Sequence, residues 1–149
     1  MSRMASLPTR PTGLLDRAGA LWAGLCALHC LALPLAFVAA PALTAALYSF
    51  HAPQHGLAIA LLRAISLEPW FIGISAAVSG LAIGHGAYWH RRWPPVVLAL
   101  AGVASLALAW FGRLAFDGWA HLIGIGLGGA LLVGAHLWNL RLLARLRRS

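Results

Sequence analysis

Two cysteines and a histidine lie within five consecutive residues of an apolar stretch. Cys26 and Cys30 are the only cysteines of the chain, and His29 directly precedes the second one. Residues three and four positions apart share one face of an α-helix, so both sulfurs and the His29 ring are expected on one stripe. Polar side chains at bilayer depth are rare and mark functional sites by default, so this stripe is the first candidate.

Thiolates select soft or borderline metal ions, which makes Hg(II), Cu(I) and Zn(II) the candidate ions. The Cβ atoms of residues i and i+4 are roughly 5–6 Å apart, and two metal–sulfur bonds of about 2.3 Å span a comparable distance. A two-coordinate ion is therefore predicted between Cys26 and Cys30, with His29 as a weaker third ligand. A closed zinc site needs a fourth group from another helix.

The same pair has a plainer interpretation, because free cysteine is often just a small buried apolar residue. The phase of His29 and the lack of any other cysteine favour a site. Pro34 adds to this, because it has no N–H for the carbonyl of Cys30, and a kink is expected there.

The composition identifies the elements that position these residues. Of 149 residues, 61% are hydrophobic and 9% are charged, whereas roughly a quarter are charged in soluble domains. Several uncharged runs reach the about 20 residues that a transmembrane helix needs. The alternating ten-residue segments of a membrane barrel are absent. The net charge of +8 does not indicate nucleic-acid binding, because all eleven basic residues are arginines that cluster at the ends of apolar runs.

The predicted fold is an all-α membrane protein with four transmembrane helices in a bundle. The expected spans are residues 18–40, 70–88, 95–111 and 119–140. Between the first two spans, residues 56–63 are predicted to form a short interfacial helix.

This divides the chain into an N-terminal tail (1–17), a transmembrane domain (18–140) and a basic C-terminal tail (141–149). Nine arginines fall on one predicted side: Arg3, Arg10, Arg17, Arg91, Arg92, Arg141, Arg145, Arg147 and Arg148. Only Arg63 and Arg113 fall on the other. The positive-inside rule then places both termini in the cytoplasm.

Small residues and acidic residues have characteristic positions. Gly124, Gly128 and Gly129 in the last span, and Gly80 with Gly84 in the second, have spacings that allow close helix packing.

The acidic residues Asp16, Glu68 and Asp117 all fall near span ends, so no buried acidic proton relay is expected. No phosphate-binding loop is present, so nucleotide-driven pumping is not indicated.

The other histidines are weaker candidates. His136 lies three residues before Asn139 near the end of the last span, and we select it as a possible metal or relay ligand. His85, His90 and His121 are at other span ends, where interhelical hydrogen bonding is their expected role. His51 and His55 bracket Pro53, which predicts a loop rather than a helix there.

Three stretches together resemble the family of MerC-domain proteins. They are Cys26-Ala27-Leu28-His29-Cys30 with Pro34, His90-Arg91-Arg92-Trp93, and His136-Leu137-Trp138-Asn139-Leu140-Arg141. The resemblance extends from about Asp16 to Arg141. It implies a four-helix protein of the bacterial inner membrane that takes up mercuric ion, with Cys26 and Cys30 carrying Hg(II) inward toward a cytosolic thiol acceptor or mercuric reductase. The partners implied are the lipid bilayer, the metal ion and a metal donor outside, without any permanently bound cofactor.

The chain departs from the mercury-transporting members in two respects. Those members place the cysteines of the first helix closer together, and they carry further cysteines toward the C-terminus. Here the two cysteines are four residues apart, and no thiol follows Cys30. The C-terminal tail therefore offers no thiol for passing the metal on.

Four functions follow from these features. The leading one is a carrier or binder of a soft metal ion, with Hg(II) favoured by the resemblance, rather than an enzyme. The alternative is a membrane thiol–disulfide oxidoreductase that couples a Cys26–Cys30 disulfide to a quinone, although an i, i+4 disulfide is strained. A third is haem ligation by histidines on facing helices, drawn from His29, His85, His121 and His136. The fourth is a small scaffold within a larger complex.

Overall fold

The computed structural model describes residues 13–112 and 118–146, and α-helices make up nearly all of this part of the chain. The helices are α1 (Leu14–Ala39), α2 (Pro41–Leu47), α3 (His55–Ile65), α4 (Glu68–His90), α5 (Pro94–Gly112) and α6 (Gly118–Leu146). Four segments are long and apolar enough to cross a membrane: Leu14–Ala39, His55–His90, Pro94–Gly112 and Trp119–Leu146. The expected all-α fold with four spans, and a short helix between the first two, is confirmed.

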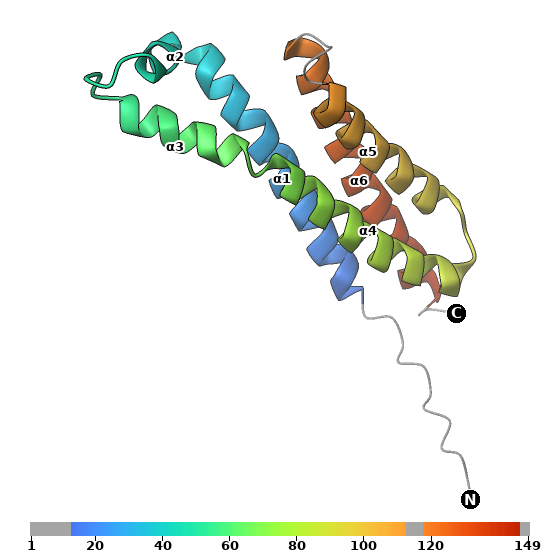
Figure 1. Cartoon of the computed structure of the whole chain (residues 1–149). Helices are drawn as coiled ribbons and strands as arrows, with labels where there is room; N and C mark the ends of the chain where they lie inside the picture. Colours follow the sequence, from blue (N-terminus) through green and yellow to red (C-terminus); the bar gives the residue numbers. More distant parts are fainter. Residues whose placement is uncertain (1–12, 113–117, 147–149) are drawn as a thin grey trace, which may run out of the picture.

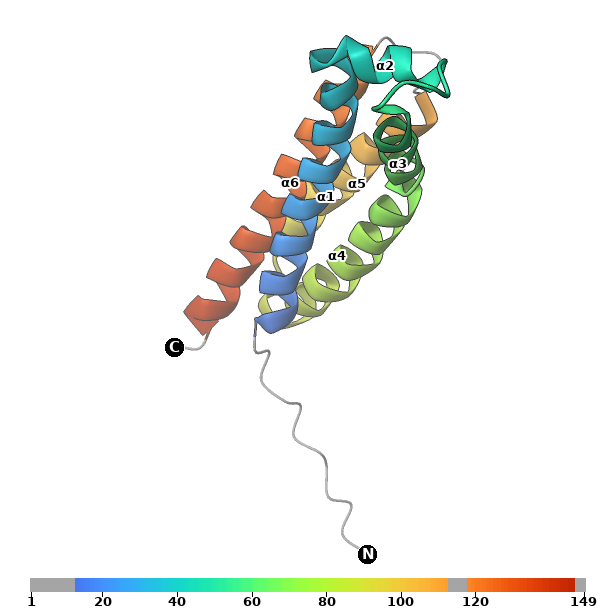
Figure 2. The ribbon, with the colours of Figure 1, turned by 90° about the vertical axis from the view of Figure 1, so that its left-hand side faces the viewer.

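The four long helices α1, α4, α5 and α6 form a bundle in which α6 packs most extensively against α5 and α1 (Figure 1). The first residues of α1 and the last residues of α6 lie at one end of this bundle, together with the turn from α4 to α5 (Figures 1 and 2). We call this end the terminal end. The helices α2 and α3 lie at the opposite end of the bundle.

The long helices extend beyond the expected spans at the terminal end. The helix α1 begins at Leu14, so Asp16 lies in its first turn rather than in a tail. The helix α6 continues to Leu146, and Leu143 near its end is still buried. Packing of these last turns explains why helix continues where the arginine content of the sequence suggested a tail. Arg3, Arg10, Arg113, Asp117, Arg147 and Arg148 lie outside the described residues.

Glycines bring α6 close to two neighbouring helices. A Cβ atom added at Gly128 would lie 2.9 Å from the carbonyl oxygen of Gly102 on α5, and one at Gly124 would lie 2.9 Å from the Cβ of Ala109. Gly129 packs in the same close manner against Ala27 of α1. These contacts agree with the close packing expected for the last span.

Gly80 and Gly84 behave differently from this expectation. No heavy atom of the described chain lies within 4 Å of a Cβ placed at either residue. Their spacing on α4 is suited to close packing, but among the described residues no helix approaches them closely. The close helix packing that this spacing allows is therefore not made within the described part of the chain.

The outer surface of the bundle is apolar. Leu21, Leu25 and Leu28 on α1 are more than half exposed, and Leu100, Leu108 and Ile123 on α5 and α6 are similarly exposed. The buried positions, in contrast, include Asp16, Glu68, Ser75, Ser79, His136 and Asn139. This distribution suits a bundle whose solvent is lipid, where polar groups face the interior.

Candidate functional site

The two cysteines lie inside the bundle. Cys26 and Cys30 are each 1% exposed and are both free thiols. Their side chains contact each other along one face of α1, and they belong to the same buried cluster as Ile83 of α4 and Leu132 of α6. The i, i+4 spacing has therefore put both sulfurs on the interior face of the helix rather than on its lipid face.

Two polar side chains of α4 accompany the thiols. The hydroxyl of Ser75 faces Cys26 and is buried, yet it completes no hydrogen bond of normal length within the described residues. Glu68, in the first turn of α4, lies close enough to interact electrostatically with both thiols. It is 2% exposed.

The helix α1 remains continuous past the thiols. It runs unbroken from Leu14 to Ala39 with Pro34 inside it. Since proline has no N–H, the carbonyl of Cys30 lacks the donor that residue 34 would normally provide. A backbone acceptor therefore lies directly beside the thiol pair.

His29 is positioned by α3 and α4. Its Nε2–H donates a hydrogen bond to the carbonyl oxygen of Ala64 on α3, at 3.1 Å. Its ring stacks on Phe71 of α4, with the ring centroids 4.4 Å apart, and Trp22 stacks on the same Phe71 at 5.3 Å. This hydrogen bond leaves Nδ1 as the nitrogen with a lone pair, which is the arrangement that supports many histidine ligands.

His136 lies in a different cluster, nearer the terminal end of the bundle. Its Nδ1 is 3.1 Å from Oδ1 of Asp16 on α1, and its Nε2 is 3.0 Å from the hydroxyl of Ser79 on α4. Asn139 donates from Nδ2 to Oδ2 of Asp16 at 2.8 Å. His90, at the end of α4, donates from Nε2 to Oδ1 of Asn139 at 2.6 Å. We call Asp16, Ser79, His90, His136 and Asn139 the terminal polar network.

The bonds of this network connect several elements. Asp16 accepts from His136 at Oδ1 and from Asn139 at Oδ2, and Nε2 of His136 pairs with the Ser79 hydroxyl. The backbone N–H of Arg92 donates to Nδ1 of His90 at 3.0 Å, which leaves Nε2 of a neutral His90 as the donor to Asn139. The network thus links α1, α4, α6 and the turn after α4.

Glycines leave the space that the network occupies. A Cβ atom at Gly19 of α1 would overlap the ring of His136, and one at Gly86 of α4 would overlap the amide of Asn139. His136 and Asn139 are both 0% exposed. The absence of two side chains therefore allows α6 to insert two polar groups between α1 and α4.

The predicted ligands occupy two separate places. Cys26 and Cys30 come together, whereas the hydrogen bonds of His29 and His136 go to Ala64, Asp16 and Ser79. Within residues 13–112 and 118–146, no three histidine, cysteine, aspartate or glutamate side chains gather into a group that would hold a metal ion. The thiol pair is thus the part of the predicted site that the fold assembles.

The remaining histidines have local partners. His121 donates from Nδ1 to the carbonyl of Ala109 at 2.9 Å, and His55 donates in the same way to Ala46 at 2.6 Å. His85 accepts a bond from the indole N–H of Trp89 at 3.2 Å. The contact of His121 agrees with the interhelical hydrogen bonding expected for it, whereas His85 bonds to a residue of its own helix.

Sequence reasoning missed the role of Asp16 and of the two serines. Asp16 was placed in the N-terminal tail, near a span end, but it is 2% exposed and holds two side chains of α6. The sequence did contain a feature that could have indicated this role. It has one acidic residue at the start of the first span, and a histidine and an asparagine three residues apart in the last span. Ser75 and Ser79, one helical turn apart, were not distinguished from packing residues.

Comparison with known protein families identifies the chain. A family model described as the MerC mercury resistance protein matches residues 16–141, which include both cysteines and the whole terminal polar network. Searches of curated proteins and of solved structures return no match. The match begins at Asp16 and ends at Arg141, the limits that the sequence motifs indicated. The chain therefore belongs to the MerC family of mercury resistance membrane proteins.

Proposed function

We propose that this protein carries Hg(II) across the bacterial inner membrane by exchange between thiolates, with Cys26 and Cys30 as the carrier ligands. The observation that supports this most directly is the pair of free, contacting thiols buried among α1, α4 and α6. Two thiolates complete the linear coordination that suits a soft dication. His29 would then orient α1 through its hydrogen bond to Ala64.

The exchange is balanced without any redox change. Cys26 loses its proton and its thiolate attacks Hg(II) held by an external thiol donor. One donor thiolate leaves and takes up the proton, and Cys30 displaces the second donor thiolate in the same way. Cytosolic thiols, or the cysteines of a mercuric reductase, reverse these two steps. Mercury remains Hg(II) throughout, and every sulfur returns as a thiol or thiolate.

We infer the direction in which Hg(II) moves from the polar side chains that lie between the thiol pair and the terminal end. From the thiol pair, Ser75, Ser79 and His136 continue toward the terminal end of the bundle, where Asp16 and Asn139 complete the network. Arg91, Arg92, Arg141 and Arg145 are exposed, and the sequence places them at this end. The positive-inside rule supports this end, with both termini, as the cytoplasmic one.

The first test is metal binding by the purified full-length protein in detergent under reducing conditions. Hg(II), Cu(I) and Zn(II) are titrated into the wild type, Cys26→Ser, Cys30→Ser and the double variant. The double variant contains no thiol at all, so it measures background binding. Tight one-to-one Hg(II) binding that is lost in both single variants supports the carrier site, and binding equal to that of the double variant rules it out.

Transport is tested separately in proteoliposomes loaded with a thiol acceptor. Uptake of Hg(II) by the wild type above that of the double serine variant supports movement across the membrane. The oxidoreductase alternative uses the same two contacting thiols and makes a different prediction. A reversible two-electron couple together with quinone reduction, without metal uptake, would favour that alternative.

A further inference from the structure

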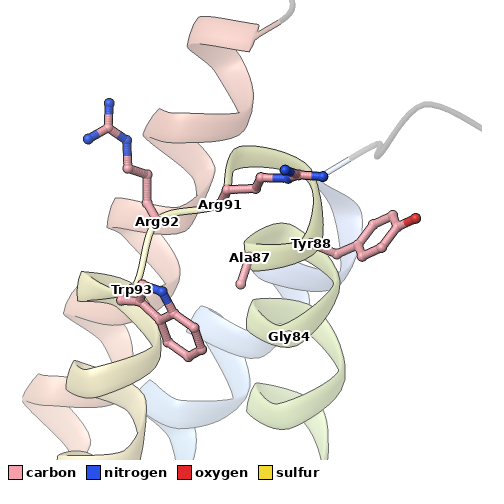
Figure 3. A pocket seen from close by; sticks show the side chains of 6 residues that line it. All are labelled: Gly84, Ala87, Tyr88, Arg91, Arg92 and Trp93. Carbon is pink, nitrogen blue, oxygen red and sulfur yellow. The ribbon is translucent and has the colours of Figure 1, made fainter.

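The turn between α4 and α5 carries two arginines beside an open pocket. The pocket has a volume of about 450 Å³ and is lined by Gly84, Ala87, Tyr88, Arg91, Arg92 and Trp93 (Figure 3). In Figure 3 the Arg91 side chain extends over the end of α4, and the indole of Trp93 lies on the α5 side. Neither arginine has a carboxylate within salt-bridge distance in the described part of the chain. The side chains of Arg91 and Arg92 extend in opposite directions from this turn, so two exposed positive charges flank the hollow without converging on it (Figure 3).

An apolar groove continues from this pocket along the bundle. It runs between α4 and α5, has a volume of about 260 Å³, and shares Gly84 with the arginine pocket. Its walls are formed mainly by Gly80, Ile83, Val96, Ala99 and Leu100. Because no described atom lies within 4 Å of a Cβ at Gly80 or Gly84, these two glycines leave the groove open on its α4 side.

Arg91 adopts an unfavourable backbone conformation at the mouth of the pocket. Its φ of 50° makes it the only non-glycine residue with positive φ among the described residues. Position 91 follows the last residue of α4, where glycine or asparagine normally occupies this left-handed region. A residue kept in such a conformation points to a use for its side chain.

We propose that the α4–α5 groove and the arginine pocket together bind an anionic phospholipid of the leaflet at the terminal end. An acyl chain lies in the groove along Gly80 and Gly84, and the phosphate of the headgroup lies at the mouth of the pocket, toward which the exposed side chains of Arg91 and Arg92 turn on binding. Tyr88 and Trp93 are 78% and 75% exposed, and amphipathic aromatic rings of this kind sit at headgroup depth. Basic pockets between transmembrane helices bind such headgroups. This proposal does not depend on metal transport.

The test is native mass spectrometry of the delipidated full-length protein in detergent. Dioleoyl phosphatidylglycerol and dioleoyl phosphatidylcholine are added separately, because they share acyl chains and differ in headgroup charge. The wild type is expected to retain phosphatidylglycerol preferentially. Removing each arginine is expected to weaken this binding roughly fivefold, as one arginine near a phosphate does at a membrane surface.

The variants are chosen so that the fold is preserved. Arg91→Gly removes the guanidinium and supplies the residue that the left-handed position favours, and Arg92→Gln removes the second charge. Arg141→Gln is the matched control, since it removes an exposed charge from α6 outside the pocket that Arg92 shares with Arg145. Equal losses in this control and in the Arg91 and Arg92 variants would overturn the proposal in favour of unspecific attraction.

The groove is tested with a filling side chain. Gly80→Leu is expected to weaken binding of both lipids, and Gly126→Leu, at an equally open position on α6, is the control that leaves binding unchanged. If glycerophosphate competes as well as the intact lipid does, the pocket is a free-anion site and the proposal fails. It also fails if Gly80→Leu converts a dimer into a monomer in the same spectra, because the groove would then be a protein interface.

Discussion

Cys26 and Cys30 form a candidate site because both lie on the face of α1 that points into the bundle. The i, i+4 spacing directs both sulfurs into the bundle, where Ser75 and Glu68 are their polar neighbours. His29 shares the local sequence but hydrogen-bonds to Ala64. At the scale of residues, the thiol pair and the two predicted histidine ligands, His29 and His136, therefore have different partners, and substitutions distinguish them.

We expect His29→Ala to retain one-to-one Hg(II) binding, because two thiolates already satisfy linear coordination. The measurement is the titration described for the cysteine variants, with His121→Ala as the control for losing a histidine bonded to a backbone carbonyl. A loss of Hg(II) binding as large as that of Cys26→Ser would instead establish His29 as an obligatory third ligand.

We expect His136→Ala to lower the free energy of unfolding by about 1–3 kcal/mol, because it leaves buried acceptors and donors without partners. Asp16 and Ser79 are the groups that lose their bonds to it. Unfolding in mixed micelles of a mild detergent and dodecyl sulfate measures this change. His85→Ala is the control, because His85 is exposed. No difference between the two variants would contradict a structural role for the network.

At the scale of helices, α6 is the element that organises the molecule. It packs closely against α5 through Gly124 and Gly128 and against α1 through Gly129, and it inserts His136 and Asn139 between α1 and α4. Gly19 on α1 and Gly86 on α4 leave the space that these two side chains occupy. Close approach and polar bonding thus occur at the same interfaces, as is usual between membrane helices.

We expect Gly19→Ala and Gly86→Ala each to lower the free energy of unfolding by about 1–3 kcal/mol, because the added methyl group overpacks a filled interior. Gly24 lies on α1 with no atom within 4 Å of its Cβ position. Gly24→Ala is therefore the matched control and is expected to stabilise the helix by about 0.5–1 kcal/mol. Equal effects at Gly19 and Gly24 would contradict the close contact with His136.

The sequence predicted the elements better than their partners. Uncharged runs of sufficient length locate the four spans, and periodicity puts Cys26 and Cys30 on one face. Residues 1–17 were expected to form an arginine-containing tail, but α1 already begins at Leu14, and Asp16 in its first turn has a partner on α6. The spacing of Gly80 and Gly84 shows that a helix can approach, but it does not show whether one does.

At the scale of the whole molecule, the bundle has two unlike ends. The terminal end holds the start of α1, the end of α6 and the turn at Arg91, whereas α2 and α3 lie at the other end (Figure 1). Asp16, His136 and Asn139 belong to the terminal end, and the exposed Arg63 of α3 belongs to the other. The terminal polar network therefore lies at the end of the bundle that also carries the arginines of the α4–α5 turn.

We expect reagents that label thiols from outside to reach the α2–α3 end only. In the background of Cys26→Ser and Cys30→Ser, single cysteines are introduced as Ser66→Cys, next to α3, and as Arg92→Cys, after α4. An impermeant maleimide added to intact cells should label the first, and the second only after the cells are lysed. The reverse pattern would place both termini outside and would contradict the proposed orientation.

The terminal polar network also bears on the order of biosynthesis. Asp16 is separated from His136 and Asn139 by 120 and 123 residues. During translation, α1 therefore enters the membrane long before α6 exists, and its carboxylate must remain hydrated at the surface until the last helix arrives. We therefore expect α1 to reach its final depth in the membrane only after α6 has been translated and inserted. Insertion of α6 is thus the event that closes the bundle, and a chain interrupted before residue 136 would remain open at this end.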